Sequence, residues 1–224
     1  MINPWSNFEK SDSMVHPDDR TIFEHHNQHS KPEHQFLAHL APEPWIGNVE
    51  APIVVLLANP GATSLDVKRE EQPKALEIIS KSISNLRQEP MDYPHFFFNP
   101  NLSETAGQSW YLKAFKTLLQ DFDSKHIAKN VLTCEMAPYH SKNWKKPSND
   151  FPTQKYTNHL VKKAIQRNSI ILMHRARKLW REMVPELEKY PLKYVPSSWQ
   201  SAAISPGNYK ASYESIQIRL EQCR

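Results

Sequence analysis

The sequence predicts an α/β protein, with a short, mainly parallel sheet of four strands inside a three-layer α/β/α arrangement. Three apolar runs of strand length, residues 53–57, 131–136 and 169–173, indicate strands that are buried on both faces. Stretches with helical spacing of apolar residues lie between these runs. Because parallel strands need crossover connections, this alternation favours helices on both faces of a parallel sheet.

The N-terminal part is polar and rich in histidine and proline. We expect a helix over residues 17–29 and a shorter one around residues 33–40. The composition indicates that residues 1–45 form a helical extension and that residues 46–224 form the α/β domain. A chain of 224 residues suits one such domain with an extension.

The first predicted strand is followed by a helix over residues 76–86, where apolar side chains recur at helical spacing. Residues 88–104 then form a long loop that contains prolines and the aromatic residues Tyr93, Phe96, Phe97 and Phe98. This loop either lines a pocket or fills the core with its aromatic rings. A helix over residues 110–122 leads into the second strand.

The second half of the chain repeats the alternation. A helix around residues 160–165 precedes the third strand, and a helix over residues 176–187 follows it. Residues 193–195 form a short fourth strand, and a helix over residues 213–220 closes the chain.

Composition excludes several classes of protein. No apolar run is long enough to cross a bilayer and no secretory leader is recognisable, so we expect a cytoplasmic protein without membrane contact. The two cysteines, Cys134 and Cys223, cannot build a disulfide framework or a cysteine-ligated metal site. Neither of the glycine-rich nucleotide-binding motifs is present, and we expect no cofactor. The net charge of +4 permits contact with nucleic acid without requiring it.

The strongest indication of a site is the point where the first strand ends. Ligands of open α/β sheets collect outside the carboxyl ends of the strands, and small residues there let a substrate approach the backbone. The alternative is an ordinary turn, in which asparagine is tolerated for its backbone preferences. The residues at this point are Asn59, Pro60, Gly61, Ala62 and Thr63.

Three further segments follow predicted strands and complete a candidate pocket. They are Tyr139, His140 and Ser141 after the second strand, His174 and Arg175 after the third, and Ser205, Pro206, Gly207 and Asn208 before the last helix. The basic and aromatic residues around Trp144, including Lys145, are of the types that bind single-stranded nucleic acid. A surface loop anchored by the tryptophan is the alternative. His174, Arg175 and Lys145 are the candidates for contacts with a phosphate.

Two other patterns carry less weight. His25 and His29 stand at a spacing that metal ligands use, but no third ligand is tied to them, so we favour a solvated helix and expect no metal. No Gly-x-Ser-x-Gly motif supports a serine hydrolase.

The segment Asn59-Pro60-Gly61 resembles the first motif of the uracil-DNA glycosylase-like superfamily, in the mismatch-specific branch where the motif reads Gly-Ile-Asn-Pro-Gly. Leu57 stands where that motif begins with glycine. Residues 205–208 lie where the second motif is expected, without its sequence. The resemblance extends loosely from Pro44 to the C-terminus.

This resemblance implies a uracil-DNA glycosylase-like fold and hydrolysis of the N-glycosidic bond of a flipped-out uracil or mismatched base in DNA. Asn59 would hold the attacking water, while an aromatic residue among 93–98 or Tyr139 would stack on the base. Arg175 or Lys145 would contact a phosphate. Two alternatives remain: an inactive protein of this fold that binds a nucleobase, nucleotide or nucleic acid, and a scaffold that binds partners through residues 1–45.

Overall fold

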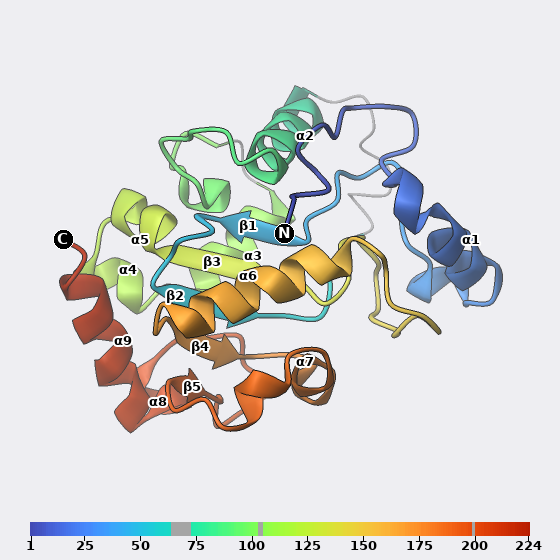
Figure 1. Ribbon diagram of the computed structural model, residues 1–224. Coiled ribbons are helices and arrows are strands. Elements are labelled where there is room, and N and C mark those ends of the chain that lie inside the picture. The colour runs from blue at the N-terminus through green and yellow to red at the C-terminus, as the bar shows by residue number, and fades with distance from the viewer. Residues whose placement is uncertain (64–72, 103–104, 199) are drawn as a thin grey trace. The chain divides into compact units, whose positions relative to one another are not determined.

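The structure is a computed structural model that describes residues 1–63, 73–102, 105–198 and 200–224 (Figure 1). A five-stranded sheet in the order β1-β3-β2-β4-β5 confirms the α/β class. The strands are β1 (Trp45–Gly47), β2 (Ile53–Leu56), β3 (Val131–Cys134), β4 (Ile170–Met173) and β5 (Lys193–Tyr194). The finer assignment, to a uracil-DNA glycosylase-like fold, stays a prediction.

The centre of the sheet is parallel, as the apolar runs predict. β2 pairs in parallel with both β3 and β4, so that Ile53 lies opposite Val131 on one side and Ile170 on the other. Every residue of these three strands is buried, which is typical of a parallel sheet covered on both faces. β5 pairs in parallel with β4 and is half-buried.

The predicted count of four strands is wrong, because β1 adds a fifth. Three residues are too few to give a periodic signal, and Gly47 ends the strand. Gly47 has a φ of +118°, and a Cβ at this position would lie 2.2 Å from the carbonyl oxygen of Val131. Only glycine therefore allows this close approach.

The helices of the described residues lie largely where the periodicity places them. They are α1 (Arg20–Gln28), α2 (Pro73–Leu86), α3 (Ala106–Ala114), α4 (Leu118–Asp121), α5 (Ser124–Asn130), α6 (Gln154–Gln166), α7 (Arg177–Met183), α8 (Pro206–Tyr209) and α9 (Ala211–Glu221). Single 3-10 turns occur at Pro17–Asp19, Pro32–His34, Phe96–Phe98 and Pro185–Glu188. No helix in the described ranges is long and apolar enough to cross a bilayer.

Three predicted helices are shorter than expected. The helix around residues 33–40 is a single 3-10 turn, since the backbone becomes extended at Gln35. The helix over residues 110–122 is split into α3 and α4. The helix over residues 176–187 breaks at Val184 (φ −132°, ψ 79°), because a residue before proline is driven out of the helical region.

The chain divides into two compact units, which are described separately. Unit 1 comprises residues 1–45, 58–90 and 135–159. Unit 2 comprises residues 46–57, 91–134 and 160–224, and it contains β2 to β5 and all but the first residue of β1.

The predicted extension, residues 1–45, packs within unit 1. Trp5 is fully buried, and the side chain of Asn3 donates a hydrogen bond to the carbonyl of Leu86 at 2.7 Å. The guanidinium of Arg87 donates to the carbonyl of Phe8 at 2.9 Å. The division into an extension and a domain stays a prediction, but these residues contribute to the core of unit 1.

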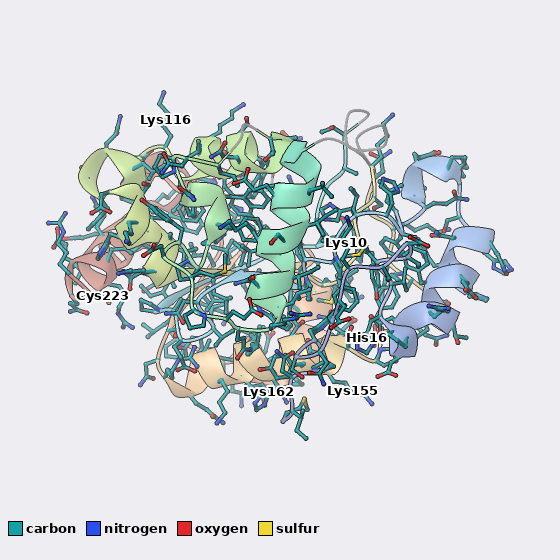
Figure 2. The ribbon with its side chains drawn as sticks, turned by 90° about the horizontal axis from the view of Figure 1, so that it is seen from above. Lys10, His16, Lys116, Lys155, Lys162 and Cys223 are labelled. Atoms are coloured by element: carbon teal, nitrogen blue, oxygen red, sulfur yellow. The ribbon has the colours of Figure 1, made fainter. Side chains whose placement is uncertain are left out.

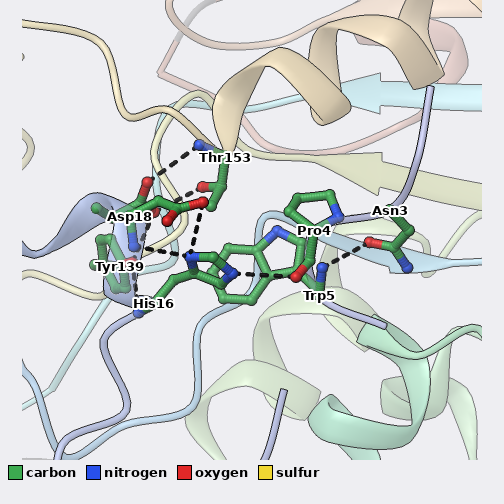
Figure 3. A network of polar contacts seen from close by, with 8 residues as sticks. Asn3, Pro4, Trp5, His16, Asp18, Tyr139 and Thr153 are labelled. Atoms are coloured by element: carbon green, nitrogen blue, oxygen red, sulfur yellow. Dashed lines mark hydrogen bonds and ion pairs between the residues drawn. The ribbon is translucent and has the colours of Figure 1, made fainter. Parts of the chain in front are cut away.

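A buried polar network joins three distant parts of the chain inside unit 1 (Figure 3). Asp19 is fully buried and accepts hydrogen bonds from the hydroxyls of Tyr139 at 2.7 Å and Thr153 at 2.6 Å, and from the backbone N–H of Thr153 at 3.1 Å. The backbone N–H of His16 donates to the Tyr139 hydroxyl. The Asp19 carboxylate thus has three donors, and one of them, the Tyr139 hydroxyl, itself accepts a hydrogen bond from His16.

In unit 2, the aromatic residues of the long loop fill the core. Phe96, Phe97 and Phe98 are buried, and Phe97 stacks on Tyr111 with ring centroids 5.2 Å apart. A Cβ at Gly107 would lie 2.7 Å from the Phe97 ring, so the ring packs against the helix backbone. These rings are therefore covered, which favours the core-filling interpretation over a pocket wall.

On the outside of unit 2, Lys116 and Lys162 point away from the ribbon (Figure 2). Lys162 forms an ion pair with Glu186 at 3.0 Å. Cys223 is exposed and Cys134 is buried, and neither forms a disulfide bond within the described residues.

Candidate functional site

Asn59 follows β2 and lies in unit 1, where its side-chain amide is held by three acceptors. The amide nitrogen donates to the carbonyl of Pro60 at 2.9 Å, to the hydroxyl of Ser141 at 2.9 Å and to the carbonyl of Tyr139 at 3.4 Å. Carbonyl oxygens cannot donate, so the nitrogen must face them and Oδ1 must point the other way. In the part of the chain that the structure describes, Oδ1 has no hydrogen-bond partner.

The two loops that carry these groups pair with each other. Gly61 and Ser141 form a parallel bridge, the N–H of Ala62 donates to the Ser141 carbonyl at 3.1 Å, and the N–H of Ser141 donates to the Pro60 carbonyl at 3.3 Å. The Ser141 hydroxyl donates to the carbonyl of Asn143 at 3.1 Å, which leaves its oxygen lone pairs for the Asn59 amide. The amide of Asn59 is therefore fixed by backbone pairing.

His140 supports the same turn from the side. Its Nδ1 lies 2.9 Å from the carbonyl oxygen of Gly61, and its Nε2 lies 3.1 Å from the carbonyl oxygen of Ala41. The carboxylate of Glu43 is 3.8 Å from Nε2. His140 thus connects the turn after Asn59 to residues 41–43.

The predicted binding residues differ in exposure. Pro60 is buried, Ala62 is half-buried, and Gly61 and Thr63 are exposed. Among the described residues, a Cβ added at Gly61 would meet nothing within 4 Å, so this part of the chain leaves the space beside Gly61 open. The backbone at Gly61 is therefore accessible to a ligand.

Tyr139 is fully buried, with its ring edge-on to Phe23 and Phe151 and its hydroxyl on Asp19. In this position the ring has no face for stacking on a base. Its carbonyl oxygen, which accepts from Asn59, is the part that reaches the site.

Lys145 and Trp144 lie on the same loop of unit 1. The ammonium of Lys145 donates to the carbonyl of His29 and to the hydroxyl of Ser30, each at 3.3 Å, which places it at the C-terminal end of α1. Trp144 lines a pocket of about 10 Å³ together with Lys146 and Phe151. This volume suits one water molecule rather than a base.

In unit 2, His174 and Arg175 follow β4 and are tied to the end of β2. Their backbone N–H groups both donate to the carbonyl of Leu56 at 3.1 Å. His174 is buried, and desolvation together with the charges of Arg175 and Arg177 lowers its pKa to about 4. The imidazole is therefore neutral at physiological pH.

The segment before the last helix is organised by Asn208. Its side-chain nitrogen donates to the carbonyls of Ser201 and Ala203, and its oxygen accepts from the N–H of Ser198. Asn208 is buried and all of these groups belong to its own loop. Ser205 and Pro206 begin α8, and a Cβ at Gly207 would meet open space.

The sequence interpretation missed a buried acid in unit 1. Glu135 directly follows β3 and is almost fully buried, and its Oε2 has no partner among the described residues. Burial, and secondarily the charge of Glu43, raise the pKa of Glu135 well above its usual value. The sequence signal that could have identified it is the position of this one acid within the apolar run over residues 131–136.

The histidines of α1 do not gather metal ligands. The rings of His25 and His29 stack at 4.3 Å, and His26 is buried against the carbonyl of His34. The described residues contain no group of three or more histidine, cysteine, aspartate or glutamate side chains placed to hold a metal ion.

The fold and the site define an α/β protein with a mostly parallel sheet and an oriented asparagine after its central strand. No family model matches the chain, and comparison with curated proteins and with solved structures finds no match either.

Proposed function

We propose that this protein hydrolyses the N-glycosidic bond of a flipped-out uracil or mismatched base in DNA, with Asn59 holding the attacking water. The observation that carries the proposal is the orientation of the Asn59 amide. Its nitrogen is occupied by three protein acceptors, and Oδ1 is left as an acceptor without a protein partner among the described residues.

An acceptor of this kind can orient a water molecule. Oδ1 would accept one hydrogen of the water, so that an oxygen lone pair points at C1′ of the extruded nucleotide. An amide is a very weak base, so the water would lose its proton only as the sugar cation is captured. Asn59 would therefore act by positioning, and a slow enzyme is expected.

The sheet topology is consistent with this proposal. β3, β2, β4 and β5 are all parallel in this order, as expected for a three-layer α/β/α protein. The resemblance of Asn59-Pro60-Gly61 to the first motif of the uracil-DNA glycosylase-like superfamily adds further support. The open space beside Gly61 would let the substrate approach the backbone.

The chain departs from that motif at Leu57, and the structure of unit 2 shows where this side chain lies. Leu57, which stands where the motif has glycine, is 6% exposed, and its carbonyl accepts a hydrogen bond from the indole of Trp180 at 2.7 Å. The leucine side chain therefore packs in the core of unit 2.

The test is release of uracil from single-stranded DNA and from G·U mispaired duplex, with the wild type and Asn59→Ala. We expect release by the wild type and a loss of at least about 100-fold in the variant, since a misplaced reactant costs this much. Asn101→Ala, at an exposed asparagine in unit 2, is the matched control and should retain full activity.

Ser141→Ala gives a second, milder variant. It removes one acceptor of the Asn59 amide and leaves Oδ1 in place, so we expect a smaller loss of activity than in Asn59→Ala. Equal release by wild type and Asn59→Ala would contradict the proposal. Binding of uracil-containing DNA without release would instead support the binding alternative, and no binding at all would reject both.

A further inference from the structure

Seven polar side-chain atoms in unit 2 are buried without a hydrogen-bond partner in the described ranges of the chain. Three of the seven belong to neighbouring side chains: Nε2 of His174, Nη2 of Arg177 and the hydroxyl of Tyr209. Nearly all buried polar atoms in native proteins are paired, so three unpaired atoms on neighbouring side chains call for an explanation. A bound polar group that the protein receives from outside would satisfy them.

The three side chains form one cluster. The rings of His174 and Tyr209 meet edge to face with centroids 5.6 Å apart, and these residues are only 3% and 4% exposed. The charge of Arg177 acts on both groups, lowering the pKa of His174 and opposing the rise that burial causes in the pKa of Tyr209. The guanidinium Nε of Arg177 is anchored on the carbonyl of Met173 at 3.1 Å.

The cluster lies where parallel α/β sheets place their ligands. β2 is flanked by β3 on one side and β4 on the other, so the chain changes direction across the sheet between β2 and β4. Ligands bind at such a switch point, outside the carboxyl ends of the two strands. His174 follows β4 directly, and its backbone N–H donates to the carbonyl of Leu56, the last residue of β2.

The charge around the cluster is positive and uncompensated. The acids that neighbour α7 in sequence are paired with other cations: Glu182 with Lys178, Glu186 with Lys162 and Glu188 with Arg181. In the described part of unit 2, no carboxylate forms an ion pair with Arg177. Arg177 is half-buried, but its Nη2 is buried, and a buried guanidinium nitrogen without a carboxylate partner favours an anion.

We propose that His174, Arg177 and Tyr209 form a binding site for a phosphate group. Nη2 of Arg177 and the hydroxyl of Tyr209 would each donate to a phosphate oxygen, and Nε2 of His174 would donate a third hydrogen bond in one neutral tautomer. Arginine and tyrosine donors suit a tetrahedral oxyanion, and the neutral histidine adds a donor without adding charge. The site stands independently of the role of Asn59.

The test is isothermal titration of the full chain with inorganic phosphate, uridine 5′-monophosphate and uridine at constant ionic strength. We expect binding of phosphate or of the monophosphate, and no binding of uridine. Equal affinities would identify the free ion as the ligand, and a tighter monophosphate would identify a nucleotide. Binding should raise the unfolding temperature, and the rise should grow with the logarithm of the ligand concentration once that concentration exceeds Kd.

Three variants make the test specific. Tyr209→Phe keeps the ring and removes one donor, so we expect an affinity loss of up to about 10-fold. Arg177→Met should abolish binding, whereas Lys178→Met removes the same charge from the next residue of α7, which is 90% exposed, and should bind as the wild type does. Failure of both phosphate ligands to bind would overturn the proposal. Undiminished binding by folded Tyr209→Phe and Arg177→Met would do so too.

Discussion

At the scale of single residues, partners decide what a side chain can do. Asn59 could present either its nitrogen or its oxygen to a ligand, and the carbonyls of Pro60 and Tyr139 leave only the oxygen. Asn208 carries the same amide, but its own loop uses both ends. Of these two candidate asparagines, Asn59 is therefore the one whose side-chain oxygen can accept a hydrogen bond from a ligand.

Gly61→Ala should separate ligand approach from folding. Gly61 does not have a positive φ, and an added Cβ meets no atom of the described residues within 4 Å, so we expect the free energy of unfolding to change by no more than about 1 kcal/mol. Base release should fall, because the methyl group would occupy the space that the substrate needs. The measurements are denaturant unfolding and base release on one preparation.

Gly47→Ala is the contrasting control, since its Cβ would lie 2.2 Å from a backbone oxygen and its φ is +118°. This variant should be strongly destabilised. Full base release by Gly61→Ala would show that no substrate approaches the backbone at that turn.

At the scale of elements, the network around Asp19 holds the start of α1 to the segment that precedes α6. Asp19 precedes α1, and Thr153 precedes α6. Burial is the largest influence on the Asp19 carboxyl and raises its pKa, while the hydrogen bonds from Thr153 and Tyr139 oppose that rise. The donors thus offset part of the desolvation of the carboxylate.

Tyr139→Phe should therefore destabilise the protein by about 1–3 kcal/mol, because it leaves a buried carboxylate short of a donor without creating a cavity. Urea unfolding at pH 7 gives this value. Thr153→Val removes the other hydroxyl, and the double variant should show coupling, since both donors share one acceptor atom. Strictly additive losses would mean that the two hydroxyls act independently.

At the scale of the whole molecule, buried histidines make the stability depend on pH. Burial lowers the pKa of His95 to about 3, and the pKa of His174 is about 4. The unfolded chain takes up these protons near pH 6.5. Stability that these groups contribute is thus present above pH 6.5 and is lost as the pH falls towards their folded pKa values.

His95→Gln should reduce this dependence. Linkage predicts that His95 alone lowers the free energy of unfolding by about 2 kcal/mol when the pH falls from 7 to 5. The free energy of unfolding of His95→Gln should therefore fall by about 2 kcal/mol less than that of the wild type over this range. Urea unfolding at both pH values measures the difference. Glu135 has the opposite effect, because its raised pKa favours the folded state as the pH falls. This effect cancels when the change in the free energy of unfolding with pH is compared between the variant and the wild type.

His25→Gln is the matched control, because His25 is exposed on α1. It should show the pH dependence of the wild type. If the free energy of unfolding of His95→Gln changed with pH as much as that of the wild type, His95 would be protonated in the folded protein.

Much of the fold could be predicted because its signals are local. The strands β2, β3 and β4 are continuous apolar runs, whereas the break before Pro185, although its signal is also local, was not predicted. β1 was missed because its pairing depends on Gly47 meeting a strand more than 80 residues away. The split between α3 and α4 and the whole of α5 were also missed.

The candidate site was predictable in part for the same reason. Asn59 and Ser141 follow adjacent parallel strands, so their meeting follows from the topology. The burial of Tyr139 could not be predicted, because its partner Asp19 is 120 residues away. Arg177 and Tyr209 lie in different helices, and only folding shows that their polar atoms are buried together with His174.

The sequence by itself determined the α/β class, the parallel strands and the asparagine at the end of the central strand, because periodicity and turn residues act over a few positions. The tertiary structure decided which polar atoms are satisfied. That distinction depends on partners far apart in the chain. They bring three acceptors to the nitrogen of Asn59, while among the described residues its oxygen has no donor.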